Sequence, residues 1–383
     1  MNFDLSEEQQ LLKDSVARTF AKSYDFEARA RILASPAGWS RAAWMQMAEL
    51  GLLGLPFAPE DGGFGGGPVE TMIVMEAIGR ALVVEPYLST AVLAAAVLRH
   101  GGSPALRARL VPQVADGCLI LAFAHGEPQA RWELSDVATS AERVEGGYLL
   151  CGRKSVVVGG DVADMLIVSG RMSGPPRHPT GLGLFLVNGS APGVTIKAYA
   201  TQDGRRAADI RLDSVFVADV DVVGDPAGAL PVIARAVDEA IAAICAEAVG
   251  AMDEAVAMTV EYLKTRQQFG VAIGTFQALQ HRAADMFVAL EQARSMALFA
   301  VMSVAEKNPQ TRAIAMSAAK IQIARSARFI GEQAIQLHGG IGMTMEYKVG
   351  HLFKRLVMID KEFGDLDHHL DRLAAGTSLL EEA

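Results

Sequence analysis

The order of structural patterns along the chain is the feature that most constrains how it can fold. In the first third, apolar residues recur at helical spacing, as Leu12, Val16 and Phe20 do. The middle third carries short apolar runs such as 184–187, bounded by Gly, Pro, Asn and Asp, which are typical of strands. Long helical patterns then return. The sequence therefore predicts an α+β protein with an N-terminal helical domain over residues 1–116, a middle antiparallel β domain over 117–228 and a C-terminal four-helix bundle over 229–383.

Capping and breaker residues place the individual helices. Ser6 and Gln9 have the spacing of a capping box, so the first helix is expected to begin at Ser6. Strands and helices do not alternate, and no Gly-x-Gly-x-x-Gly run stands between a strand and a helix, so a Rossmann nucleotide-binding fold is disfavoured. Long helices are expected in the C-terminal region over residues 230–265, 275–307, 310–336 and beyond 346.

Charge and composition exclude several classes of function. The formal net charge is −9 and no Lys/Arg run is present, so binding to nucleic acid or to an anionic membrane surface is not expected. Residues 1–8 are acidic, whereas an export signal begins with basic and then apolar residues, so export is not expected. The most apolar long stretch, 240–252, is shorter than the roughly 20 residues that cross a bilayer. Because the three cysteines are not at metal-ligand spacing, we expect a cytoplasmic protein without a metal site.

Three short motifs in the bundle region carry chemistry. Arg266 and Phe269 follow the first long helical pattern, Gln277 lies eleven residues beyond Arg266, and two glycines follow Gln336-Leu337-His338. Glycine adopts backbone geometries that are closed to other residues. Each motif also has an ordinary structural interpretation, as a charge at a helix C-terminus, a solvated helix residue and a helix stop.

Together with the loop 59–65, these motifs resemble the acyl-CoA dehydrogenase family over essentially the whole chain. The resemblance implies bound FAD, with an arginine on the cofactor diphosphate and glycines that let the backbone approach the pyrophosphate in a neighbouring subunit. The cofactor-binding residues that it implies are Arg266, Phe269, Gln277, Gln336, Leu337, His338, Gly339 and Gly340.

The same resemblance implies FAD-dependent α,β-dehydrogenation of an acyl-CoA thioester, which requires a carboxylate base for the α-proton. At the two places where the family carries this base, the present sequence has Phe363 and Ala240. Glu247, the one charged residue in 240–252, is the first candidate for the catalytic base, and Glu362 is the second. Alternatively, Glu247 pairs with an arginine or lysine of the bundle, and Glu362 is a solvated charge.

The middle domain departs from the family pattern at the flavin. Where the family has a Trp-x-Thr segment against the flavin ring, this chain has the valine run 156–158, and Gly126 replaces a threonine before the retained Glu127-Pro128. With the segment 363–370, these changes are most similar to the small subunit of two-gene, pimeloyl-CoA dehydrogenase-like members.

This closer resemblance implies an enzyme of fatty acid metabolism that assembles as a homo- or heterotetramer with a second acyl-CoA dehydrogenase subunit and passes electrons to an acceptor. Two alternatives remain. The chain is a non-catalytic subunit that completes the FAD site of a heteromeric enzyme, or it is a flavin oxidase or monooxygenase on the same fold.

Overall fold

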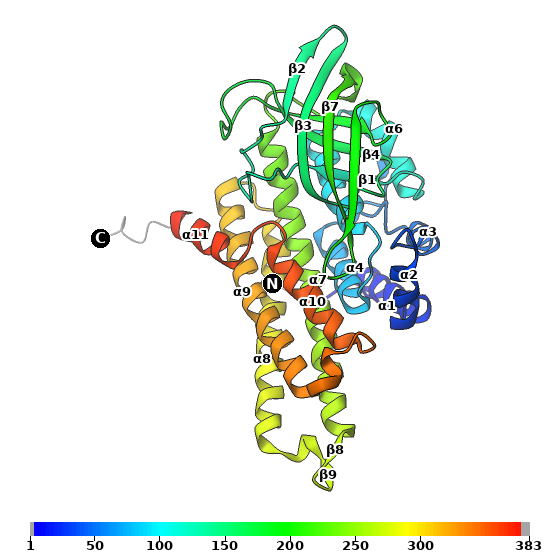
Figure 1. Cartoon of the computed structure of the whole chain (residues 1–383), viewed down its shortest axis with the longest axis vertical. Helices are drawn as coiled ribbons and strands as arrows, with labels where there is room; N and C mark the ends of the chain where they lie inside the picture. Colours follow the sequence, from blue (N-terminus) through cyan, green and yellow to red (C-terminus); the bar gives the residue numbers. More distant parts are fainter. Residues whose placement is uncertain (1–3, 377–383) are drawn as a thin grey trace, which may run out of the picture. The chain divides into compact units, whose positions relative to one another are not determined.

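The computed structural model describes residues 4–376 (Figure 1). The chain forms two compact units. Unit 1 comprises Met1–Arg31, Pro68–Val83 and Ile241–Ala383, and unit 2 comprises Ile32–Gly67 and Val84–Ala240. This partition follows contacts rather than chain order, and the division into three consecutive domains stays a prediction.

Unit 1 is helical. The first helix begins as predicted, because the Ser6 hydroxyl accepts a hydrogen bond from Gln9 N at 3.2 Å and the Gln9 side chain accepts one from Ser6 N at 2.9 Å. The final segment, predicted as one helix, consists of two helices separated by a turn. The helices that lie in unit 1, wholly or for most of their length, are α1 (Glu7–Ser23), α2 (Phe26–Ala34), α4 (Pro68–Ala81), α7 (Leu230–Thr265), α8 (Gln277–Ser303), α9 (Pro309–His338), α10 (Lys348–Lys361) and α11 (Leu366–Gly376).

Within unit 1, α9 packs against α8, α10 and α11, while α1 packs on α4, and α4 packs on α8 (Figure 1). A short hairpin of β8 (Gln267–Gln268) and β9 (Val271–Ala272) joins α7 to α8. Among the described residues, none of the helices combines the length and the apolar composition that a membrane span requires. The helical C-terminal region that the sequence predicts is confirmed.

Two glycines bring α4 and α7 into direct backbone contact. A Cβ atom added at Gly79 would lie less than 3.0 Å from the carbonyl oxygen of Glu247, and one added at Gly250 would lie equally close to the carbonyl oxygen of Glu76. Because backbone atoms cannot move aside as a flexible side chain can, both positions require glycine. The crossing therefore fixes α4 against the turn of α7 that carries Glu247.

Unit 2 combines three short helices with a sheet. The helices are α3 (Arg41–Glu49), α5 (Ala95–Gly101) and α6 (Pro104–Ala115). The helix predicted around residues 89–99 is present, but its first part, Leu88–Ala94, is a π-helix, a local widening that residue periodicity does not reveal.

The sheet of unit 2 has seven strands in the order β1-β4-β2-β3-β7-β6, with β5 paired to β4. Most pairings are antiparallel, as predicted, and β4 runs parallel to β1 and β2. The strands are β1 (Leu121–Ala124), β2 (Ser140–Val144), β3 (Gly147–Val158), β4 (Met165–Arg171), β5 (Leu182–Asn188), β6 (Val194–Ala200) and β7 (Arg206–Ala218). Their buried side chains, including Leu166, Phe185 and Ile210, form one core.

Candidate functional site

The hairpin between α7 and α8 presents a cation and an aromatic ring to solvent. Phe269 and Gly270 close the hairpin with φ angles of 54° and 83°, the left-handed pair that a tight two-residue turn requires. The backbone of Arg266 is fixed, since its N–H donates to Tyr262 and its carbonyl accepts from Ile273 N, both at 2.8 Å. Its side chain is exposed, and Phe269 is 91% exposed. The hairpin therefore holds two exposed groups on a rigid support.

Gln277 is the first residue of α8 and is also exposed. The first N–H groups of a helix have no partner within the helix and carry partial positive charge. An amide side chain at this point lies beside free backbone donors, an arrangement suited to an anionic or polar ligand.

The glycine turn after α9 is open on its outer side. Gly339 has φ 64° and ψ −140°, a conformation that only glycine adopts easily. A Cβ atom at Gly339 or Gly340 would meet no heavy atom within 4 Å. Packing inside the chain therefore gives no reason for a glycine at 340, and the backbone there is free for the close approach of another group.

The last residues of α9 support this turn. Gln336 is exposed, whereas Leu337 and His338 are buried. The His338 ring contacts the rings of Tyr262 and Tyr347, with centroids 4.6 and 5.1 Å away, and burial lowers the pKa of His338. Because Tyr262 lies in the last turn of α7, just before Arg266, the hairpin and the glycine turn are at the same end of unit 1 (Figure 1).

Both carboxylates predicted as catalytic bases bind one buried arginine. Arg355 of α10 donates to Glu247 from Nε at 2.6 Å and from Nη2 at 2.9 Å. It also donates to Glu362 from Nη1 at 2.6 Å and from Nη2 at 3.2 Å. The Glu247 side chain is 1% exposed and that of Glu362 is 14% exposed. All four carboxylate oxygens thus accept hydrogen bonds from the same guanidinium.

Glu239, the carboxylate beside the other family position for the base, is also held by hydrogen bonds. Glu239, next to Ala240, accepts hydrogen bonds from Arg99, from His100 Nε2 at 2.7 Å and from Arg235 at 3.3 Å. Burial alone would raise its pKa, but the hydrogen bonds and the positive charges of His100 and Arg99 hold the pKa at about 2.

The turn between α10 and α11 is anchored through its carbonyl groups. Lys320 Nζ donates to Gly364 O at 2.7 Å and to Asp360 O at 3.1 Å, and His369 Nε2 bonds Phe363 O at 3.2 Å. Phe363 has φ 58°, so this bulky residue is held in a left-handed conformation. His369 is buried, and its ring supports this turn from within.

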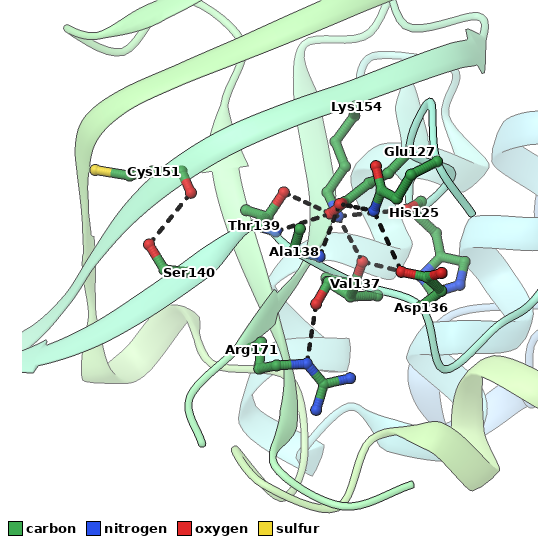
Figure 2. A network of polar contacts seen from close by, with 12 residues as sticks. His125, Glu127, Asp136, Val137, Ala138, Thr139, Ser140, Cys151, Lys154 and Arg171 are labelled. Carbon is green, nitrogen blue, oxygen red and sulfur yellow. Dashed lines mark hydrogen bonds and ion pairs between the residues drawn. The ribbon is translucent and has the colours of Figure 1, made fainter. Parts of the chain in front are cut away.

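In unit 2 a buried ion pair organises the segment after β1 (Figure 2). Lys154 Nζ donates to Glu127 at 2.7 Å and to Ser169 Oγ at 2.9 Å, while His125 Nδ1 bonds the same Ser169 hydroxyl at 2.9 Å. Glu127 also accepts from the Thr139 backbone at 3.0 Å and its hydroxyl at 2.6 Å. This network ties β1, β3 and β4 to the loop that follows Glu127.

The charges within this network perturb one another. Burial lowers the pKa of Lys154 to about 8, although Glu127 opposes the shift. Burial would raise the pKa of Glu127, but Lys154 and the hydrogen bonds lower it to about 2. Burial and the nearby Lys154 lower the pKa of His125 to about 3, so its ring is neutral at neutral pH. A carboxylate and an ammonium thus remain paired beside a neutral imidazole.

Arg171 joins two loops at the edge of the same sheet (Figure 2). Its guanidinium donates to Val137 O at 2.9 Å and Ser135 O at 2.6 Å, and also to carbonyl groups of the loop at 173–180. Asp136, in the first loop, pairs with Arg177 in the second at 2.7 Å. Nothing in the sequence identified Arg171, because a side chain that binds backbone carbonyls leaves no residue-type pattern.

None of the described residues forms a group of three or more His, Cys, Asp or Glu side chains that could hold a metal ion.

Comparisons with known proteins agree with this arrangement. Family models match residues 6–118 (acyl-CoA dehydrogenase, N-terminal domain), 122–215 (middle domain) and 230–377 (C-terminal domain). The probable acyl-CoA dehydrogenase YngJ of Bacillus subtilis is 29% identical, with all of both chains covered. A variant of the steroid ACAD Tcur3481–Tcur3483 is 28% identical, with 97% of each chain covered and a TM-score of 0.87. The ChsE4–ChsE5 complex from Mycobacterium tuberculosis is 25% identical, with 98% of each chain covered and a TM-score of 0.87. The chain belongs to the acyl-CoA dehydrogenase family, whose enzymes use FAD.

Proposed function

We propose that this chain functions in the FAD-dependent α,β-dehydrogenation of an acyl-CoA thioester, as an oxidoreductase that acts on CH–CH donors. The observation that carries this proposal is the end of unit 1, where the exposed Arg266 stands near a glycine turn whose outer side is open. A diphosphate binds to cations and to backbone that it can approach closely.

The residues fit the cofactor in distinct ways. Arg266 supplies charge, Gln277 supplies an amide at a helix N-terminus, and Gly339 and Gly340 supply accessible backbone. Gln336 and Phe269 are exposed beside them, while the buried Leu337 and His338 hold the backbone of the turn. We assign direct cofactor contact to the exposed residues and support of the turn to Leu337 and His338.

The chemistry that bound FAD would supply is the acceptance of a hydride from the β-carbon of the thioester. The protein must then take the α-proton. Glu247 remains our first candidate for this base and Glu362 the second, and either must leave Arg355 before it can receive a proton. Since Arg355 is buried against both carboxylates, that release is costly.

A second candidate function follows from this cost. With Glu247 and Glu362 held by Arg355, and Glu239 held by three basic residues, the chain is suited to complete the FAD site of a partner that supplies the base. In an assembly of identical copies, every copy would have Glu247, Glu362 and Glu239 bound to basic residues. The partner would therefore be a second, different acyl-CoA dehydrogenase chain, in a two-gene assembly of the pimeloyl-CoA dehydrogenase-like type.

Two of the similar solved structures are of two-component proteins, Tcur3481–Tcur3483 and ChsE4–ChsE5. This supports a heterotetramer over a homotetramer for the present chain. We further propose a cytoplasmic location, an electron-transferring acceptor and a role in fatty acid metabolism. The free Cys118 and Cys151 at the surface are consistent with a reducing compartment.

The deciding experiment is the visible spectrum of the purified chain before and after anaerobic addition of a panel of acyl-CoA thioesters. Bound flavin that bleaches identifies a self-sufficient dehydrogenase, and loss of bleaching in Glu247→Gln would support Glu247 as the base. Flavin that stays oxidised, but bleaches after co-purification with a second acyl-CoA dehydrogenase chain, supports the partner-subunit function. Rapid reoxidation by oxygen would favour an oxidase or monooxygenase instead.

A further inference from the structure

The strand β3 carries a bulge that holds a valine in an unusual conformation. Lys154 pairs with Ile210 and Val157 pairs with Ala208, so Ser155 and Val156 together face the single residue Asp209 of β7. Val156 has φ 53°, a left-handed value that is a genuine outlier for a β-branched residue. Its side chain is 57% exposed. The fold therefore keeps an aliphatic side chain in solvent at a strained backbone position.

The Asp209 carboxylate replaces the backbone acceptor that a regular strand pairing would supply at this bulge. Its Oδ1 accepts hydrogen bonds from Val156 N at 3.2 Å, from the Ser155 hydroxyl at 3.2 Å and from the Tyr199 hydroxyl at 3.0 Å. The other bulge amide, Ser155 N, donates to Gly126 O at 2.8 Å. Both amides of the bulge are thus satisfied outside the regular ladder.

The charges around Asp209 favour its ionised form. Burial alone would raise the pKa of this carboxyl, but the hydrogen bonds from Val156, Tyr199 and Ser155 lower it below its ordinary value. Lys197 lies directly opposite Asp209 on β6 and adds attraction. Burial and the bond to Asp209 raise the pKa of Tyr199 to about 12, so Tyr199 remains a donor at neutral pH. The bulge therefore has a fixed anionic acceptor.

We propose that Asp209 is a positioning residue, which holds Val156 in its left-handed conformation and, through Ser155, holds Gly126 in register with it. The strain at Val156 persists because Asp209 and Gly126 each satisfy one amide of the bulge. This inference deepens and rests on the proposed function, with the valine run and Gly126 placed at the flavin by the family resemblance. Asp209 would then shape the cofactor pocket without touching the cofactor.

The test is a double-substitution cycle on the full chain, read by FAD affinity from the quenching of flavin fluorescence. Asp209→Ala is expected to weaken FAD binding about tenfold, the effect of losing one charged hydrogen-bond acceptor. Asp213→Ala is the matched control, since Asp213 is exposed on the same strand with Arg211 3.6 Å away, and should change affinity less than about twofold.

The second arm uses Val156→Gly. Glycine adopts the left-handed conformation unaided, so Asp209→Ala in this background should change FAD affinity by less than about twofold. An equal, tenfold loss in both backgrounds would overturn the positioning role, as would an Asp209→Ala chain that binds FAD like the control. Should Asp209→Ala fail to fold, Tyr199→Phe and Asp209→Asn provide milder losses, each expected to lie between wild type and tenfold.

A further measurement separates this inference from the proposed function. Hydrogen exchange of the Val156 amide should accelerate in Asp209→Ala and Asp209→Asn and stay unchanged in Asp213→Ala, whether or not FAD is bound. An isolated wild-type chain that binds no FAD contradicts a self-sufficient dehydrogenase but agrees with the partner-subunit function, and the exchange result then decides the role of Asp209 alone. Unchanged exchange at Val156 would show that Asp209 does not hold the bulge.

Discussion

Arg355 determines how much freedom two acidic residues have. A buried guanidinium that binds two carboxylates is stable only while both carboxylates stay in place, because all three charged groups have lost their hydration by water. Here the arginine and Glu247 are nearly inaccessible to solvent, and Glu362 is only slightly exposed. The cluster therefore stabilises the contact of α10 with α7 and restricts both carboxylates.

Replacing Arg355 tests this restriction. Arg355→Met is expected to lower the free energy of unfolding by about 3–5 kcal/mol, because it leaves buried carboxylates without their shared donor. The measurement is urea denaturation. Arg328→Met is the control, since Arg328 pairs with Glu332 on the exposed side of α9, where an ion pair contributes less than about 1 kcal/mol. Equal losses in the two variants would contradict the structural role of Arg355.

His125 makes a distinct prediction about pH. Its folded pKa of about 3 lies below the ordinary 6.5, so the unfolded chain binds a proton that the folded chain does not. Stability therefore falls as the pH drops from 6.5 toward 3. Glu127, with a pKa of about 2 against 4.5, adds a loss of the same sign between pH 4.5 and 2.

Denaturation of wild type and His125→Gln at pH 7 and pH 5 measures the His125 part. The variant should lose less stability between these two pH values than wild type, while His281→Gln, at an exposed position, should behave like wild type. Parallel losses in wild type and His125→Gln would refute the prediction.

Among the elements, the crossing of α4 and α7 depends on two missing side chains. Gly79→Ala and Gly250→Ala each place a methyl group against a backbone carbonyl of the other helix, so the helices must separate. We expect each to cost about 3 kcal/mol, at the upper end of overpacking effects. Thermal or urea denaturation measures this cost, and a loss below about 1 kcal/mol would mean that the crossing is not tightly packed.

The glycine turn after α9 should show the opposite behaviour. Gly340→Ala introduces a methyl group with no neighbour within 4 Å, so stability should change by less than about 0.5 kcal/mol. FAD affinity should nevertheless fall, because the methyl group stands where the cofactor backbone contact is proposed. A variant that unfolds more easily, or that binds FAD as wild type does, would count against this division of roles.

At the scale of helices and strands, the sequence predicts where helices lie better than it predicts which residues they contact. The capping box at Ser6 and the long helices are local patterns, and the structure confirms them. The strand β2 was not predicted, since Ser140, Glu142 and Arg143 are polar and only one of its residues is buried. Glu247 was recognised as unusual, but its partner lies 108 residues away on another helix. No local pattern specifies such a pairing.

The whole molecule exposes apolar side chains that a monomer has little reason to keep. Phe287 and Val288 on α8 are both more than half exposed, and Phe299 and Met302 follow farther along the same helix. Several large apolar side chains exposed on one helix are a feature of surfaces that contact another chain. The helix therefore supports the proposed assembly.

Light scattering on the purified protein tests this expectation. The wild-type chain should have a mass above that of one copy, and the double substitution Phe287→Glu with Val288→Glu should reduce it. Phe216→Glu, at an exposed aromatic residue of β7, is the control and should leave the mass unchanged. A monomeric wild type, or a mass insensitive to α8, would remove this support.

The sequence alone could indicate the family and propose residues for contact with FAD, because those motifs are short and continuous. Whether the chain carries its own base depends on Arg355, Arg99 and His100, whose contacts with Glu247, Glu362 and Glu239 arise only when distant segments fold together. The same residues could be catalytic or structural until those contacts are known.

The two kinds of glycine in this chain carry different evolutionary information. Gly79 and Gly250 are required by the packing of α4 against α7, so every descendant that keeps this helix crossing should keep both. Packing within the chain does not require glycine at 340, so under the proposed cofactor contact a lineage that abandoned the cofactor would be free to replace Gly340 at no cost to folding. Related genes that retain the first pair but have lost the third glycine would therefore mark subunits that have given up flavin while preserving their architecture.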